Sequence, residues 1–251
     1  MHRFIVREGL AVGARVRLSD EEAAHAFRVL RLRAGEEVEL GDGEGKLFSA
    51  ELTEVSREQV TAEVREELDY LLSVREEACK LTDMANRGEL PLRVTHNDTK
   101  INNVLFSPID KRAMVVVDLD TVMPGLVGHD FGDAIRFAAN REPEDSRNLE
   151  NVGLNMDVYR AFSEGFLEQT AGTLTQNEID TLASSCLTLT VELATRFLAD
   201  YILGDPYFNT STADHNLVRT RCQIALAKDM QKNLPAMEEC IRSCVNRMNV
   251  K

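Results

Sequence analysis

The sequence lacks any uninterrupted apolar run close to the roughly twenty residues that span a bilayer, and its N-terminus lacks the apolar core of a signal peptide. We therefore expect a cytoplasmic protein with no membrane partner. Five cysteines occur without a CxxC pair, and Cys240 and Cys244 have the spacing of one helical turn. This pattern predicts reduced, packed thiols and argues against disulfides or a zinc site.

Basic residues are also scarce relative to acidic ones. The 251 residues include 29 Lys and Arg against 42 Asp and Glu, which gives a formal net charge of -13. Such a balance repels nucleic-acid backbones and anionic membranes, although it leaves room for a local basic patch. The 43% of hydrophobic residues is enough for a packed core, in one large domain or two smaller ones.

No Gly/Ser linker or internal repeat divides the chain, yet its two parts differ in pattern. Residues 1–65 contain short β-prone runs and glycine-rich turns, interrupted by one helix that begins at Ser19 with acidic residues in its first turn. Strands at this spacing predict a compact barrel. The runs are residues 4–6, 14–18, 37–40, 47–55 and 59–64.

From residue 66 the apolar spacing becomes helical, with Gly88 as the C-cap of a first helix. Short strands are predicted at 92–94, 104–106 and 113–117. Further helices are predicted near 132–139, 156–169, 176–203, 216–233 and 236–248. The fold class is therefore α+β, with a small barrel over residues 1–65 and a mainly helical domain over residues 66–251.

The residues between the predicted strands have the spacing of a phosphotransferase site. Asp98 follows His96, Asn103 comes five residues later, and a β-branched strand ends at Asp118. A carboxylate can orient a hydroxyl and take its proton, and amide and carboxylate oxygens suit Mg²⁺. We therefore expect Asp98 to be the base, Asn103 and Asp118 to be metal ligands, and His96 to brace the loop.

Two other carboxylates compete for the metal. Asp130 begins an Asp-Phe-Gly triplet, but it lies too far from Asn103 for one hairpin and lacks a preceding apolar strand. We expect Asp130 and Asp133 to brace the catalytic loop from the start of a helix. Asp120 is either an exposed strand-end carboxylate or a second metal ligand.

These motifs resemble the C-terminal lobe of the aminoglycoside phosphotransferase / choline kinase superfamily, and the N-acetylhexosamine kinase branch in particular. The segments that carry the resemblance are 90–100, 117–125, 129–136, 196–201, 204–208 and 214–217. The resemblance implies a kinase-like lobe that uses ATP and Mg²⁺ to phosphorylate a sugar hydroxyl. It implies the same roles for Asp98, Asn103 and Asp118, and it suggests Arg136 or Asn140 near the sugar.

The N-terminal part resembles a different family. Residues 1–6, 25–40 and 42–45 are similar to the N-terminal PUA-like barrel of ribosomal-RNA uridine methyltransferases of the SPOUT type. In that family the barrel helps to hold rRNA. An RNA contact through this barrel would involve Arg3, Arg28, Arg31 and Arg33. The interleaved apolar residues 29, 30 and 32 fit an ordinary amphipathic element equally well, and the surrounding acidity favours that alternative. Because no SPOUT domain follows, methyltransferase activity is not implied.

Each part lacks the partner that completes its site in the family it resembles. No glycine-rich phosphate loop precedes residue 66, and nothing marks Lys46 as an ATP-binding lysine. The alternatives are therefore a kinase-like phosphotransferase with very low activity, an inactive natural or engineered chimeric scaffold, and an RNA-binding module. A truncated domain would expose apolar surface that a homodimer could cover.

Overall fold

The computed structural model describes residues 2–6, 16, 18–19, 22–23, 26, 32–33, 35–41, 47–52 and 64–249. The chain forms two compact units. One contains Met1–Leu68 together with Phe197–Leu217, and the other contains Asp69–Arg196 together with Val218–Lys251. Each unit is described separately.

The N-terminal segment of the first unit forms a sheet of three strands. β1 (His2–Ile5) pairs in parallel with β2 (Glu37–Gly41), and β2 pairs antiparallel with β3 (Leu47–Glu51). Phe4 of β1 and the alternate residues Val38 and Leu40 of β2 enter a small core. Ser19 accepts a hydrogen bond from the backbone N–H of Glu22 at 3.2 Å, as its predicted capping role requires.

The predicted barrel is not found in the part of the chain that is described. A barrel closes only when its outer strands pair with other strands, but the described strands stop at the order β1-β2-β3. The predicted run 59–64 falls outside the described residues except at its last position, and most of the run 14–18 does as well.

The turn after helix α7 (Gln176–Leu203) belongs to the same unit and is built around Asp200. Its carboxylate accepts the backbone N–H groups of Tyr207 and Phe208 at 3.0 and 2.9 Å. Asn216 donates to Asp200 at 2.9 Å and to Asp205 at 2.8 Å. This network satisfies polar groups that the turn buries.

The predicted helix that begins near residue 65 is two helices, α3 (Arg65–Ser73) and α4 (Arg75–Asn86), which break at Val74. The predicted helix end at Gly88 is confirmed, with Arg87 as the C-cap and Gly88 directly after it. Gly88 has φ +74°, and the N–H groups of Gly88 and Glu89 donate to Ala85 and Met84, which is the Schellman pattern.

Residues 64–249 contain six helices in total. The others are α5 (Val127–Ala138), α6 (Met156–Thr170), α7, and α8 (His215–Asn249). The predicted helices 216–233 and 236–248 are therefore one, and α8 continues through Pro235. α7 is long and apolar enough to cross a membrane, but 61% of its most apolar window is buried within the protein, as in a core helix.

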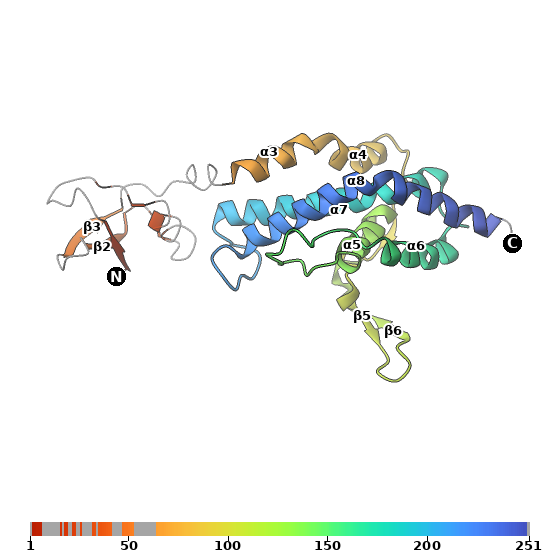
Figure 1. Ribbon diagram of the computed structural model, residues 1–251, viewed down its shortest axis with the longest axis horizontal. Helices are drawn as coiled ribbons and strands as arrows, with labels where there is room; N and C mark the ends of the chain where they lie inside the picture. Colours follow the sequence, from red (N-terminus) through yellow and green to blue (C-terminus); the bar gives the residue numbers. More distant parts are fainter. Residues whose placement is uncertain are drawn as a thin grey trace. The chain divides into compact units, whose positions relative to one another are not determined.

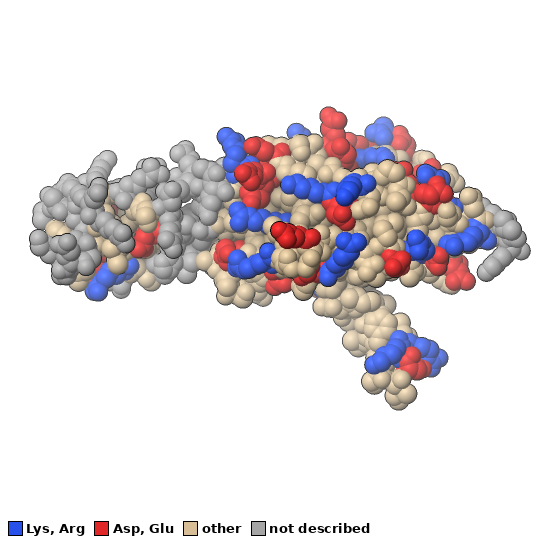
Figure 2. Space-filling view, in the orientation of Figure 1, with Lys and Arg blue, Asp and Glu red and all other residues tan. Residues whose placement is uncertain are grey.

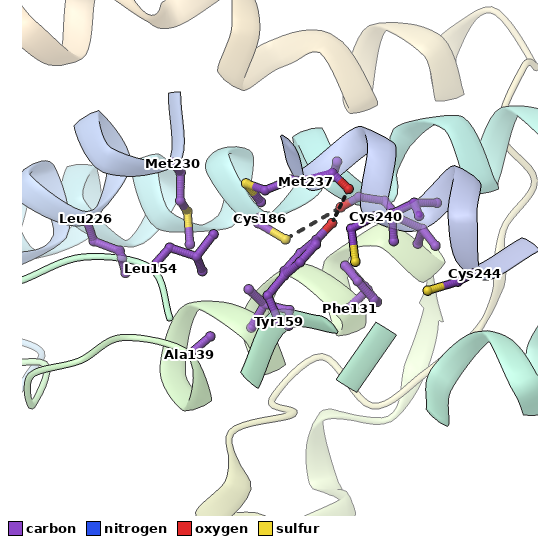
Figure 3. Packing of buried hydrophobic residues seen from close by; sticks show 14 of the residues in the cluster. Phe131, Ala139, Leu154, Tyr159, Cys186, Leu226, Met230, Met237, Cys240 and Cys244 are labelled. Carbon is purple, nitrogen blue, oxygen red and sulfur yellow. Dashed lines mark hydrogen bonds between the residues drawn. The ribbon is translucent and has the colours of Figure 1, made fainter. Parts of the chain in front are cut away.

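The core of the second unit lies between α5, α6, α7 and α8 (Figure 3). The Phe131 ring packs edge-on against Tyr159, Phe162 and Phe166, with centroid distances of 6.2, 5.6 and 5.1 Å. The Tyr159 hydroxyl donates to the Met237 carbonyl at 3.3 Å, so the buried ring keeps a polar partner.

Two antiparallel strand pairs lie beside these helices. β4 (Arg93–Thr95) pairs with β7 (Met123–Gly125), a strand that the sequence pattern did not predict. β5 (Val104–Phe106) pairs with β6 (Ala113–Val116), with a register shift between Leu105 and Phe106. Figure 1 shows the β5–β6 hairpin projecting away from the helices of its unit.

Helices α5 and α7 cross closely at Gly132. A Cβ atom on this residue would lie 2.5 Å from the Ser185 carbonyl oxygen, which belongs to the α7 backbone. We expect Gly132→Ala to lower the free energy of unfolding by about 2 kcal/mol, because the helices must separate. Urea denaturation followed by circular dichroism measures this.

Gly165 is the matched control, because it lies within α6 and a Cβ there meets nothing within 4 Å. Gly165→Ala should raise the free energy of unfolding by about 0.5–1 kcal/mol through helix propensity alone. Equal effects of the two substitutions would refute the close crossing.

Candidate functional site

The loop that follows β4 is anchored by one carboxylate. Asp130, in the first turn of α5, accepts the backbone N–H of His96 at 2.8 Å and that of Asn97 at 2.7 Å, one on each oxygen. Asn97 has φ +62°, a left-handed conformation that asparagine tolerates better than most residues. The loop therefore turns sharply at Asn97, and its start is fixed to α5.

His96 holds the loop against the end of β6. Its Nδ1 accepts the backbone N–H of Asp98 at 3.3 Å, so the ring proton lies on Nε2, which donates to the Val117 carbonyl at 3.0 Å. The Thr121 hydroxyl donates to the His96 carbonyl at 2.6 Å. All polar atoms of His96 are thus paired, which leaves its ring a bracing role.

Asp98 is half-buried, and its contacts converge on one oxygen. Lys100 Nζ and Asn103 Nδ2 both donate to Oδ2, each at 2.9 Å, and Asn103 also donates to the Asp98 backbone carbonyl at 2.8 Å. Among the described residues no group donates to Oδ1. One carboxylate oxygen is therefore oriented by the loop, and the other remains for a ligand.

Lys100 is a site residue that the sequence analysis missed. Its hydrogen bond to Asp98 raises the pKa of the ammonium group; partial burial opposes this, and the charges of Asp98, Asp118 and Asp133 add to it. The group therefore stays protonated among three carboxylates. In the sequence, the one signal for Lys100 was its position two residues after Asp98, the expected base.

The expected metal ligands lie at neighbouring points of the backbone. Val117 donates its N–H to the Asn103 carbonyl at 2.9 Å, which places Asp118 next to the end of the loop. Asp118 is exposed and has φ +63°, so the chain turns away after β6. Because Asn103 Nδ2 points to Asp98, its Oδ1 faces away from that residue.

These donors fit a hard cation. The described residues include no group of three or more His, Cys, Asp or Glu side chains arranged to hold a metal ion. Asn103 and Asp118 offer two oxygens, and Mg²⁺ commonly takes one or two protein ligands and completes its shell with water and phosphate. The exposed Asp120 lies on the turn Leu119–Thr121, and no described residue donates to its carboxylate.

The other expected residues form a polar cluster behind the loop. Asp133 accepts from Thr99 at 3.5 Å and from Arg136 at 2.9 Å. The buried Arg136 also pairs with Glu144 at 2.5 Å. Asn140 donates to the Cys222 sulfur at 3.8 Å, so its amide faces α8.

Two of the four arginines expected to contact RNA can be placed. Arg3 on β1 is exposed and donates to Glu39 on β2 at 2.8 and 3.1 Å, so a neighbouring carboxylate offsets its charge. Arg33 is exposed. Arg28 and Arg31 lie outside the described residues.

Comparison with known families gives a match in the N-terminal part of the chain. Residues 18–65 match the RNA methyltransferase PUA domain. The match covers about a fifth of the chain, and it confirms the predicted similarity of this segment to that domain. The resemblance of residues 66–251 to a phosphotransferase lobe stays a prediction.

β4, which leads into the loop, is joined to the start of α7 by a buried carboxylate. Glu178 accepts from the Thr175 N–H at 2.7 Å, and Thr175 Oγ1 accepts from the Glu178 N–H at 3.3 Å, which forms a capping box. Arg93 donates to both oxygens of Glu178 at 2.6 and 2.7 Å. Burial raises the pKa of Glu178, but the hydrogen bonds from Arg93 and Thr175 outweigh it and lower the pKa.

We expect Glu178→Gln to lower the free energy of unfolding by about 2 kcal/mol at pH 7, because it breaks charged hydrogen bonds. A folded-state pKa below the unfolded value gives stability that is present above about pH 4.3 and is lost as the pH falls through the folded pKa. The difference in unfolding free energy between wild type and Glu178→Gln should therefore shrink below about pH 4. Urea titrations from pH 3 to pH 7 measure it.

Glu239→Gln is the control, because Glu239 forms an exposed ion pair with Arg242. Its effect should stay within about 0.5 kcal/mol at every pH. If the loss of unfolding free energy in Glu178→Gln did not change with pH, the lowered pKa assigned to the Glu178 carboxylate would be contradicted.

Proposed function

We propose that residues 66–251 carry the acceptor-binding and metal-binding half of an ATP-dependent phosphotransferase that acts on a sugar hydroxyl. The observation that supports this most strongly is the orientation of Asp98, whose Oδ2 is held by Lys100 and Asn103. The resemblance of residues 90–136 to sugar kinases supplies the substrate class.

In this proposal Asp98 accepts the proton of the acceptor hydroxyl through Oδ1. Asn103 and Lys100 fix the carboxylate plane, so the hydroxyl is oriented before transfer. Lys100 keeps its positive charge and offsets negative charge that develops on the transferred phosphoryl group. Asn103 Oδ1 and Asp118 would hold Mg²⁺, which supplies charge neutralisation on the nucleotide phosphates.

The proposal predicts weak binding and slow turnover. Positioning and electrostatics supply nearly all the catalysis in phosphoryl transfer, and residues 1–65 show no glycine-rich phosphate loop or ATP-binding lysine. The alternative is an inactive chimeric scaffold, which folds but catalyses nothing. The experiment must distinguish this scaffold from a weak phosphotransferase.

Isothermal titration of the full chain with ATP, with and without Mg²⁺, tests the proposal. We expect Mg²⁺-dependent binding with a dissociation constant in the millimolar range, and at least a tenfold loss in Asp118→Ala, which removes one of the two residues that would hold Mg²⁺. Asp98→Asn should keep the binding and abolish phosphate transfer to hexosamines.

Asp110→Ala is the matched control, because this carboxylate is on the hairpin turn and pairs with Arg112. It should leave ATP binding unchanged. No heat at millimolar ATP, or binding indifferent to Asp118, would refute a nucleotide site here and leave the scaffold interpretation.

A second function, RNA binding, is favoured by the match of residues 18–65 to the RNA methyltransferase PUA domain. We propose that this segment contacts the RNA backbone through Arg28 and Arg31. The surrounding acidity limits the affinity, because the net charge of -13 repels phosphates. Contacts with RNA must therefore come from a local group of basic residues.

Fluorescence anisotropy with a labelled ribosomal-RNA hairpin at several salt concentrations tests RNA binding. Changing Arg28 and Arg31 to Ala together should reduce the slope of log affinity against log salt by about 2, one for each phosphate contact. Arg242→Ala, an exposed arginine on α8, should leave the slope unchanged. Equal slopes for all three proteins would overturn the assignment.

A further inference from the structure

The proposed base and one proposed metal ligand lie on two separate segments of the chain. Asp98 is in the loop that Asp130 anchors to α5, and Asp118 comes two residues after strand β6. The β5–β6 hairpin joins the segments, and Figure 2 shows its stem as an uncharged extension with charged groups gathered at the turn. Because the hairpin projects away from the helices of its unit, contacts next to Asp118 itself must set its distance from Asp98.

Asp118 lies between two attachments to this loop. On its N-terminal side, Val117 donates its N–H to the Asn103 carbonyl at 2.9 Å and accepts from His96 Nε2 at 3.0 Å. On its C-terminal side, the next hydrogen bond to the loop in the described part of the chain is made by Thr121. The two residues between Asp118 and Thr121 are exposed. The position of the Asp118 backbone after β6 therefore depends on Thr121.

Thr121 holds the loop through two groups. Its hydroxyl donates to the His96 carbonyl at 2.6 Å, and its own carbonyl accepts from Asn97 Nδ2 at 3.1 Å. The hydroxyl also lies 3.4 Å from the Asp118 carbonyl, but its single proton serves the shorter contact. His96 and Asn97 immediately precede Asp98, so Thr121 is attached to the part of the loop that carries the base.

The Asn97 amide that binds Thr121 is itself held in place. Its Oδ1 lies 3.0 Å from the Thr95 hydroxyl, within hydrogen-bonding distance. Strand β7 passes close by, because a Cβ atom on Gly125 would lie 2.8 Å from that Oδ1 atom and 2.3 Å from Thr95 Oγ1. Glycine is therefore required at this point of β7, and the Asn97 side chain stays packed against the strand with its Nδ2 on Thr121.

We propose that Thr121 is a positioning residue, which fixes Asp118 relative to Asp98 and so aligns a metal-binding carboxylate with the base. This inference rests on the proposed phosphotransferase function. In phosphoryl transfer the reacting groups must be aligned in advance, and a misplacement of about 1 Å costs roughly a hundredfold in rate. Thr121 therefore affects the rate of transfer, although it contacts neither the acceptor nor the nucleotide.

Initial rates of phosphate transfer from labelled ATP to N-acetylglucosamine, measured with the full chain and Mg²⁺, test this role. Thr121→Val keeps the shape of the side chain and removes the donor to the His96 carbonyl. We expect its kcat to fall roughly tenfold or more, while the KM for the sugar changes less than about twofold, because Thr121 does not contact the sugar. Thr121→Ser keeps the hydroxyl and should recover most of the rate.

Thr170→Val is the matched control, because the Thr170 hydroxyl donates to the Phe166 carbonyl at 2.7 Å, within α6 and outside the site. It should leave kcat and KM unchanged. Thr121→Ala also lacks the hydroxyl and places no methyl group against the His96 carbonyl, so it should lose rate as Thr121→Val does. A wild-type kcat in Thr121→Val, or no recovery in Thr121→Ser, would overturn the role.

Hydrogen exchange, measured by NMR on the ligand-free chain, gives a readout that does not depend on activity. Val122 donates its N–H to the Leu119 carbonyl at 3.2 Å across the turn that Thr121 closes, whereas the Asn97 N–H is held by Asp130 on α5. Thr121→Val should speed exchange at Val122 about threefold or more and leave exchange at Asn97 unchanged. Unchanged exchange at Val122 would show that Thr121 does not hold the turn.

These measurements separate the role of Thr121 from the proposed function. If the wild-type chain binds no ATP and transfers no phosphate, the proposed function fails, and the role of Thr121 fails with it even when exchange at Val122 rises. If the wild type transfers phosphate and Thr121→Val does so equally well, the function stands and only the role of Thr121 is refuted.

Discussion

The geometry of the candidate site depends on the Asp130 carboxylate. It receives two consecutive backbone N–H groups from the loop that holds Asp98, so the loop can move relative to α5 only by leaving these donors unpaired. α5 is itself fixed, because Phe131 is buried among aromatic rings and Gly132 lies against the α7 backbone. The position of Asp98 is thus set by the packing of the helical core.

Local signals predicted much of the fold, and long-range constraints explain where they failed. α6 and α7 begin where expected, and Asn155 caps α6 by accepting the N–H groups of Asp157 and Val158. The break at Val74 was missed because the apolar spacing continues through it. β7 was missed because three residues with a central proline give no alternation, and only pairing with β4 makes them a strand.

The spacing of Asp98, Asn103 and Asp118 was enough to locate a loop in which they lie close together, since these positions bracket one short hairpin. The same spacing gave no indication of the pairing between Arg93 and Glu178, which lie 85 residues apart in sequence. Contacts of that range depend on how helices pack, and a single sequence carries no local pattern for them. The barrel was inferred from turn spacing, which indicates strands but not closure.

Pro235 has a consequence for the way in which α8 opens. Proline has no amide hydrogen, so the helical bond to the carbonyl four residues earlier, that of Gln231, is missing. In hydrogen exchange, a helix interrupted in this way can open in two cooperative segments. Residues 236–249 would then exchange as a separate unit, and the burial of Met237, Ile241 and Cys244 in the core would set how often that unit detaches.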